Sequence, residues 1–107
     1  MKPIRVQLSR RQGWRKPENT IVVARPTVWG NPFPIGKLGR EEAIRRFRDM
    51  MDDPREMAAW LYPSVKQIKA KLRGKNLACW CALPEHGETD LCHAAILLEI
   101  ANEPTPD

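Results

Sequence analysis

The sequence predicts a small α/β or α+β domain, in which a short mixed sheet is packed by about four helices. The chain has 107 residues, enough for one hydrophobic core. Two runs typical of strands lie before residue 26, and helical patterns dominate from residue 40. One apolar run near residue 78 directly follows a helical pattern and precedes another, which is typical of sheet-and-helix layers. We expect a single domain over residues 1–102 and a flexible tail over residues 103–107.

Two short runs near the N-terminus predict strands. Residues 4–9 (IRVQLS) alternate apolar and polar side chains, and residues 20–25 (TIVVAR) form a β-branched run. We expect the two to pair as a hairpin with a long connection. Residues 25–36 contain three prolines and two glycines, which favours a structured loop.

The middle of the chain predicts three helices. Residues 40–51 (REEAIRRFRDMM) carry apolar side chains at helical spacing, and residues 54–62 form a second, shorter pattern. Residues 63–74 predict a third helix, with Pro63 in its first turn and Gly74 as its C-cap. Its polar face carries Lys66, Lys69, Lys71 and Arg73.

The last third predicts one strand and one helix. Residues 75–81 (KNLACWC) are typical of a buried strand. Residues 90–102 (DLCHAAILLEIAN) predict a final helix with Asp90 as its N-cap. We expect Trp14, Trp60 and Trp80 to lie in the core, although Trp14 also has basic neighbours.

The net charge of +5 is concentrated near the N-terminus, where residues 5–17 contain no acid. Such a run favours a phosphate-bearing partner, and the simpler alternative is a solvated basic surface. The side chains expected to contact nucleic acid are Arg10, Arg11, Trp14, Arg15 and Lys16. The sequence shows neither a signal peptide nor an apolar run that would span a membrane, so we expect a cytoplasmic protein, in a host cell if phage-encoded, without a membrane partner.

Several motifs appear together in one order: RRQGWRKPENTIVVARPTVWGNPF, a Gly-Arg-Glu-Glu helix, LRGKNLACWC and LCHAAILLEIAN. From about residue 7 to 102 the chain resembles the domain of unknown function 4326 family of small phage and bacterial proteins. Its second half is also similar to the domain of unknown function 488 family, in which a strand ending in Cys is followed by a Cys-His pair opening a helix. The resemblance implies a compact α/β domain of phage type and assigns no activity.

All three cysteines and both histidines lie within residues 76–100. Cys79 and Cys81 should share one face of their strand while Trp80 faces the other way. Cys92, in the first turn of the last helix, should lie near both thiols. An odd number of cysteines and the expected reducing compartment argue against a disulfide framework.

Three interpretations of this cluster stay open. Zinc would use the three cysteines and either His86 or His93, but the one-residue gap and the neighbouring Cys92 and His93 argue against it, and we predict no cofactor and no bound zinc. A reactive thiol would use Cys92 or Cys79 as nucleophile and His93 or His86 as base. Finally, the cysteines can be small core residues.

The RPTVWGNPF loop supplies a candidate ligand clamp. Arg25 can bind phosphate, Trp29 can stack on a base and Asn31 can read a base edge, with Cys81 on the facing side. The alternative is a rigid plug, in which Trp29 fills the core, Gly30 adopts a positive φ and Asn31 braces a turn. We expect Arg25, Trp29 and Asn31 to border the same cleft as Cys92 and His93.

These features support three hypotheses for function. The first is binding of a nucleotide, nucleobase or other phosphorylated ligand between this loop and the CWC/CH element, with catalysis left open. The second is a nucleic-acid-binding module that uses the basic N-terminal segment and the Lys-rich helix. The third is a non-enzymatic phage modulator of a host protein.

Overall fold

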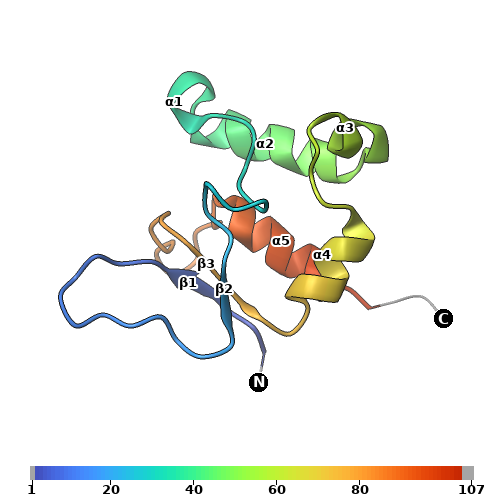
Figure 1. The fold of residues 1–107 in the computed structure, drawn as a ribbon. Coiled ribbons are helices and arrows are strands. Elements are labelled where there is room, and N and C mark those ends of the chain that lie inside the picture. Colours follow the sequence, from blue (N-terminus) through green and yellow to red (C-terminus); the bar gives the residue numbers. More distant parts are fainter. Residues whose placement is uncertain (1, 105–107) are drawn as a thin grey trace.

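A three-stranded sheet with its most buried strand in the centre organises the fold (Figure 1). The computed structural model describes residues 2–104. The strands are β1 (Arg5–Gln7), β2 (Thr20–Val22) and β3 (Asn76–Cys79), in the order β1-β3-β2 and all parallel. Leu77, Ala78 and Cys79 are buried, so this nearly continuous apolar segment takes the central position.

The α/β class is confirmed, but the sheet is parallel rather than mixed and the expected hairpin is wrong. β3 lies between β1 and β2, and hydrogen bonds from Leu8 N to Cys79 O and from Val23 N to Ala78 O extend both pairings. A loop over residues 8–19 leaves the carboxyl end of β1 and returns to the start of β2, which makes the two strands parallel. Three-residue strands carry too little pattern to reveal this order from sequence.

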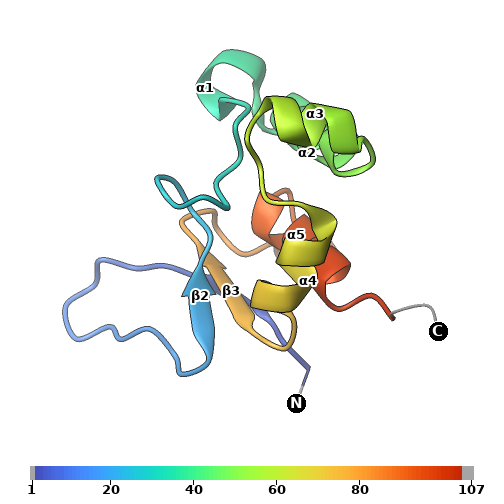
Figure 2. The same cartoon turned by 45° about the vertical axis from the view of Figure 1, so that its right-hand side comes forward.

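Within residues 2–104, five helices accompany the sheet. Figure 2 shows how they are arranged around it. They are α1 (Ile35–Leu38), α2 (Arg40–Met51), α3 (Pro54–Ala59), α4 (Val65–Leu72) and α5 (His93–Ala101). α5 packs against β3 and β1, α4 packs on α5, and α2 contacts α5 from the end that also carries α1 and α3. Among the described residues, none of the helices is apolar and long enough to cross a bilayer.

The helix termini differ from expectation at two caps. α4 begins after Ser64, whose hydroxyl and the Gln67 side chain form a reciprocal capping box, so Pro63 precedes the cap instead of entering the first turn. α5 begins after Cys92, because the Asp90 carboxylate is engaged by an arginine instead of capping the helix.

The tryptophan side chains are less buried than expected. Trp60 and Trp80 are 48% and 46% exposed, and Trp14 is partly buried against the core. The largest fully buried side chains include Phe47, Met50, Ile68, Leu72 and Leu97. The helices therefore supply most of the core. Of the expected tail, residues 105–107 lie outside the described part, and the boundary at 102 stays a prediction.

Candidate functional site

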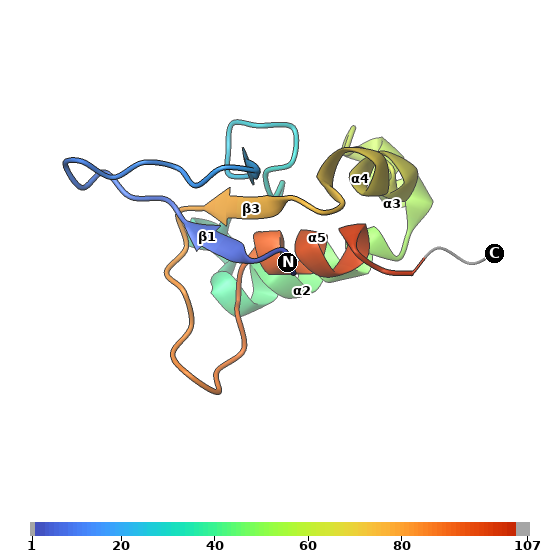
Figure 3. The same ribbon diagram turned by 90° about the horizontal axis from the view of Figure 1, so that it is seen from below.

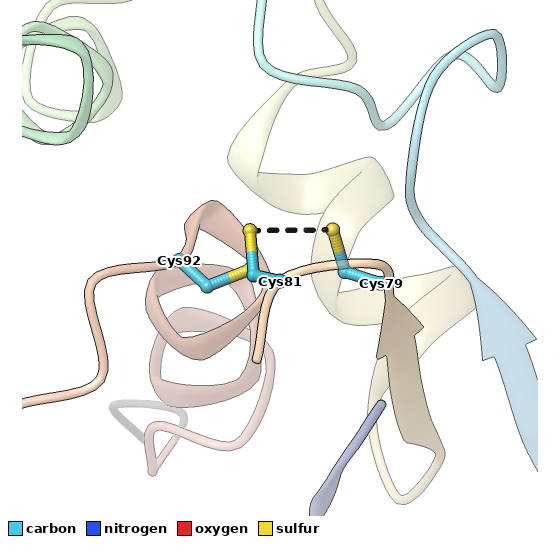
Figure 4. Close-up of side chains that lie close together, drawn as sticks. All are labelled: Cys79, Cys81 and Cys92. Carbon is cyan, nitrogen blue, oxygen red and sulfur yellow. Dashed lines mark hydrogen bonds between the residues drawn. The ribbon is translucent and has the colours of Figure 1, made fainter. Parts of the chain in front are cut away.

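The three cysteines converge where the carboxyl end of β3 meets the start of α5 (Figure 4). Their Sγ atoms all lie within 4.8 Å of one another, and the Sγ atoms of Cys79 and Cys81 are 3.9 Å apart. The shared space predicted from the sequence is confirmed. Tetrahedral zinc with Zn–S bonds of about 2.3 Å separates its sulfur ligands by about 3.8 Å. The three cysteines are thus close enough to hold a metal ion.

The spacing of the cysteines and of His93 along the chain does not exclude a metal ion, for two local reasons. β3 ends at Cys79 and the chain bends through Trp80 and Cys81, so the extended geometry assumed for a one-residue gap does not apply. Cys92 is the N-cap of α5, with φ −136° and ψ 139°, so it is not offset from His93 by one helical step. The Nδ1 atom of His93 lies 3.9 Å from the Cys92 Sγ.

His93 is oriented by a backbone contact on its far side. Its Nε2 lies 2.7 Å from the carbonyl oxygen of Val23, which can only accept a hydrogen bond, so Nε2 carries the proton. In the neutral ring Nδ1 therefore has its lone pair free on the side of Cys92. A backbone carbonyl behind a histidine is a common support for a metal ligand. His86 is exposed in the preceding loop and lies outside the cluster.

Arg5 supports the loop that joins the cysteines, and sequence reasoning missed it. Its side chain is only 4% exposed and forms two hydrogen bonds with the Asp90 carboxylate, at 2.6 and 2.9 Å. It also donates to the carbonyl oxygens of Cys81 and Ala82. One guanidinium thus ties both ends of the loop over residues 81–90. The alternation in β1 suggests a solvent-facing position for Arg5, and nothing in the sequence indicates its distant partner.

Contacts within the cluster shift the pKa values of the three thiols in different directions. Hydrogen bonds from the thiols of Cys81 and Cys92 lower the pKa of Cys79 far below its ordinary value. The same contacts with Cys79 raise the pKa of Cys81 and of Cys92, and burial adds to both increases. For Arg5, burial lowers the pKa, but the hydrogen bond with Asp90 and the nearby Cys92 outweigh it, so that pKa is raised. The cluster can thus hold negative charge beside a buried cation.

A hollow of about 290 Å³ opens beside the cluster. Its lining includes Arg25, Asn31, Cys79, Cys81 and His93. The predicted convergence of the loop and the CWC/CH element is therefore confirmed for these side chains. Cys92 is fully buried behind the hollow and does not line it.

Trp29 does not border this hollow, contrary to expectation. It lines a separate hollow of about 560 Å³ with Val28, Leu61 and Tyr62, and the Tyr62 hydroxyl donates to the Trp29 carbonyl. Trp29 packs partly buried against the core from that side. Two consecutive turns, closed by hydrogen bonds from Thr27 N to Ala24 O and from Gly30 N to Thr27 O, direct the indole away from the thiols.

Arg25 braces the loop that it begins. Its Nε donates to the carbonyl of Asn31 and its Nη2 to that of Phe33, yet the residue as a whole stays exposed. A Cβ at Gly30 would lie 2.9 Å from Arg25 Cγ and 3.2 Å from its Cα. Glycine is thus needed there for close approach, and not for the positive φ that we expected.

The contacts of Asn31 match those of a turn brace. The side chain is buried, its Oδ1 accepts from Phe33 N, and its Nδ2 donates to the Ala43 carbonyl. We expect Asn31→Ala to lower the free energy of unfolding by about 1–3 kcal/mol, because the Phe33 N–H loses its acceptor and the Ala43 carbonyl loses one donor. Urea titration beside the exposed control Gln12→Ala measures the loss. A change no larger than that of the control would contradict the brace and restore a role in reading a ligand.

The basic side chains that we expected to contact nucleic acid lie on the loop over residues 8–19. Arg10, Arg11, Arg15 and Lys16 are exposed, and none of them forms an ion pair within residues 2–104. On the Lys-rich helix, Lys71 lines the Trp29 hollow and not the one beside the thiols.

Comparison with known proteins gives one match. A family model described as "Domain of unknown function (DUF4326)" matches residues 6–103. None of the curated proteins and none of the solved structures matches the chain.

Proposed function

Because the chain belongs to the domain of unknown function (DUF4326) family, whose description names no activity, we propose a function from its site alone. The protein binds a nucleotide-like or other phosphorylated ligand in the hollow between the Arg25–Asn31 turn and the thiol cluster, and a zinc ion held by that cluster supports the hollow. The observation that carries the proposal is the convergence of Arg25, Cys79, Cys81 and His93 on one hollow. The likeness to the 488 family and the phage origin stay predictions.

The donor set favours zinc over harder cations. Three sulfurs and one imidazole nitrogen are soft or borderline ligands, whereas magnesium and calcium prefer oxygen. Among the described residues no carboxylate joins the close group formed by the three sulfurs, and the Asp90 carboxylate is engaged by Arg5. Cys79, Cys81 and Cys92 would supply three thiolates. The close group formed by their sulfurs does not include His93, whose Nδ1 lies 3.9 Å from the Cys92 Sγ, so the ring held by Val23 would have to shift toward the other sulfurs to act as a fourth ligand. We therefore replace the expectation of a metal-free protein.

The hollow suits a ligand that is partly flat and partly anionic. Arg25 is an exposed residue that lines the hollow; its Nε and Nη2 donate to the loop, and its Nη1 has no partner among the described residues. Trp80 contributes an aromatic wall. Guanidinium groups bind phosphate through paired hydrogen bonds, and aromatic rings stack on bases. Burial keeps Cys92 from reaching such a ligand, which favours a supporting role over nucleophilic attack.

The binding test uses isothermal titration with the four common nucleoside 5′-monophosphates and with inorganic phosphate. We expect Arg25→Gln to weaken binding of the preferred probe about tenfold or more, since a charge-assisted hydrogen bond is lost. Arg25→Lys should retain more affinity than Arg25→Gln because it keeps the charge. The control is Arg55→Gln, an exposed arginine that does not line the hollow.

Circular dichroism of each variant separates lost binding from a disturbed loop. If Arg25→Gln folds like the parent and binds every probe equally well, the ligand does not occupy this hollow and the proposal is wrong.

A further inference from the structure

Trp80 stands at the edge of the hollow as an accessible aromatic surface. It follows the last residue of β3, where the chain bends, and it is 46% exposed. The same residue lines the hollow beside Cys79 and Cys81. Because the indole is about half accessible to solvent, a nucleic-acid base could stack on its accessible face.

A cation already lies against this indole. The guanidinium carbon of Arg10 is 4.5 Å from the centre of the Trp80 ring, a cation–π contact. Arg10 belongs to the basic loop over residues 8–19, which leaves the sheet at the edge where β3 ends (Figure 3). The contact therefore joins the basic loop to the hollow.

The loop offers more positive charge than a single phosphate needs. Arg10, Arg11, Arg15 and Lys16 are exposed without ion pairs among residues 2–104. By contrast, Arg45, Arg46 and Arg48 on α2 are paired with acids. Cations without ion pairs along one loop, of which Arg10 contacts an exposed aromatic ring, match a chain of phosphates whose bases can stack.

We propose that the natural ligand is single-stranded nucleic acid, with one base stacked on Trp80 and the adjoining phosphates along the loop over residues 8–19. This inference rests on the proposed ligand-binding hollow and names its substrate class. A base paired within a duplex has no free face for the indole, so the site selects unpaired nucleotides. Trp14, nominated from sequence, is partly buried against the core, and Trp80 takes its place.

Fluorescence anisotropy with labelled 12-mers tests the inference on the full chain. The probes are oligo-dT, oligo-U and a 12-base-pair DNA duplex, and DNA and RNA are distinguished by the first two. We expect single strands to bind at least tenfold more tightly than the duplex. Trp80→Ala should weaken single-strand binding about tenfold or more, as expected for loss of one stacked base.

Matched controls isolate the roles of the ring and of the charge. Trp60→Ala removes an equally exposed indole that does not line the hollow and should leave binding unchanged. Arg11→Gln and Arg15→Gln should each weaken binding and reduce the slope of log K against log salt by about 0.7. Arg55→Gln should change neither quantity.

The outcomes separate this inference from the proposed function. Equal affinity of Trp80→Ala and parent for oligo-dT and oligo-U, or duplex binding as tight as single-strand binding, would overturn the inference. Tight binding of a nucleoside monophosphate with no gain for a 12-mer would also overturn it, while the ligand-binding hollow stands. Failure of every probe to bind a folded protein would refute both.

Discussion

Cys79→Ser should release bound zinc and lower Tm by about 20 °C or more. Zinc binding is coupled to folding, because the ligand set exists only in the folded chain, and a structural zinc ion contributes several kcal/mol. For a domain of this size, 1 kcal/mol corresponds to about 4–8 °C in Tm. A serine hydroxyl does not replace a thiolate ligand. Elemental analysis of the purified parent should give about one zinc per chain, and the variant should give almost none.

The two histidines supply the matched control. His93→Gln should lower zinc content or affinity, because it removes the Nδ1 atom beside Cys92. His86→Gln should change neither zinc content nor Tm, because His86 is exposed and outside the cluster. A parent protein that contains no zinc, takes up none, and melts at the same temperature with and without a chelator would show that the cysteines only pack.

Arg5→Met should cost about 3–5 kcal/mol of stability, corresponding to a fall in Tm of roughly 12 °C or more. The substitution keeps a long apolar stem but leaves the Asp90 carboxylate and the carbonyl groups of Cys81 and Ala82 without their donor. The loop that carries Cys81 to Cys92 then loses its brace. Zinc affinity should therefore fall about 10- to 100-fold, as for other supporting contacts behind metal ligands. Competition with a chromogenic chelator measures that change.

Glu42→Gln is the control for an exposed ion pair. Glu42 pairs with Arg45 and Arg46 on the solvated surface of α2, so we expect a stability change much smaller than that of Arg5→Met and no effect on zinc. An Arg5→Met loss as small as this would contradict the bracing role. The double variant Arg5→Met with Asp90→Leu should recover part of the loss, because it removes the unpaired carboxylate as well.

Local signals predicted most of the elements. The helix expected over residues 40–51 matches α2, since amphipathic spacing and the following Asp-Asp-Pro break are properties of neighbouring residues. Strand alternation predicted that Cys79 and Cys81 would converge, but β3 ends at Cys79, and it is the bend through Trp80 that brings the two Sγ atoms to 3.9 Å. Gly30 was recognised as special, but its reason, close contact with Arg25, required the folded loop.

What the sequence determined by itself was the α/β class, the helices α2 to α5 and a thiol cluster near the end of β3, whereas the short helix α1 was not predicted. Only the tertiary structure decided the parallel order β1-β3-β2, the pairing of Arg5 with Asp90 and the place of Trp80 at the hollow. The physical reason is distance along the chain. Helix periodicity and strand alternation act over a few residues, whereas residues 5 and 90 meet only after the sheet and α5 have packed. The dihedral angles at Cys92, which bring its thiol beside His93, likewise depend on how the loop closes onto that sheet.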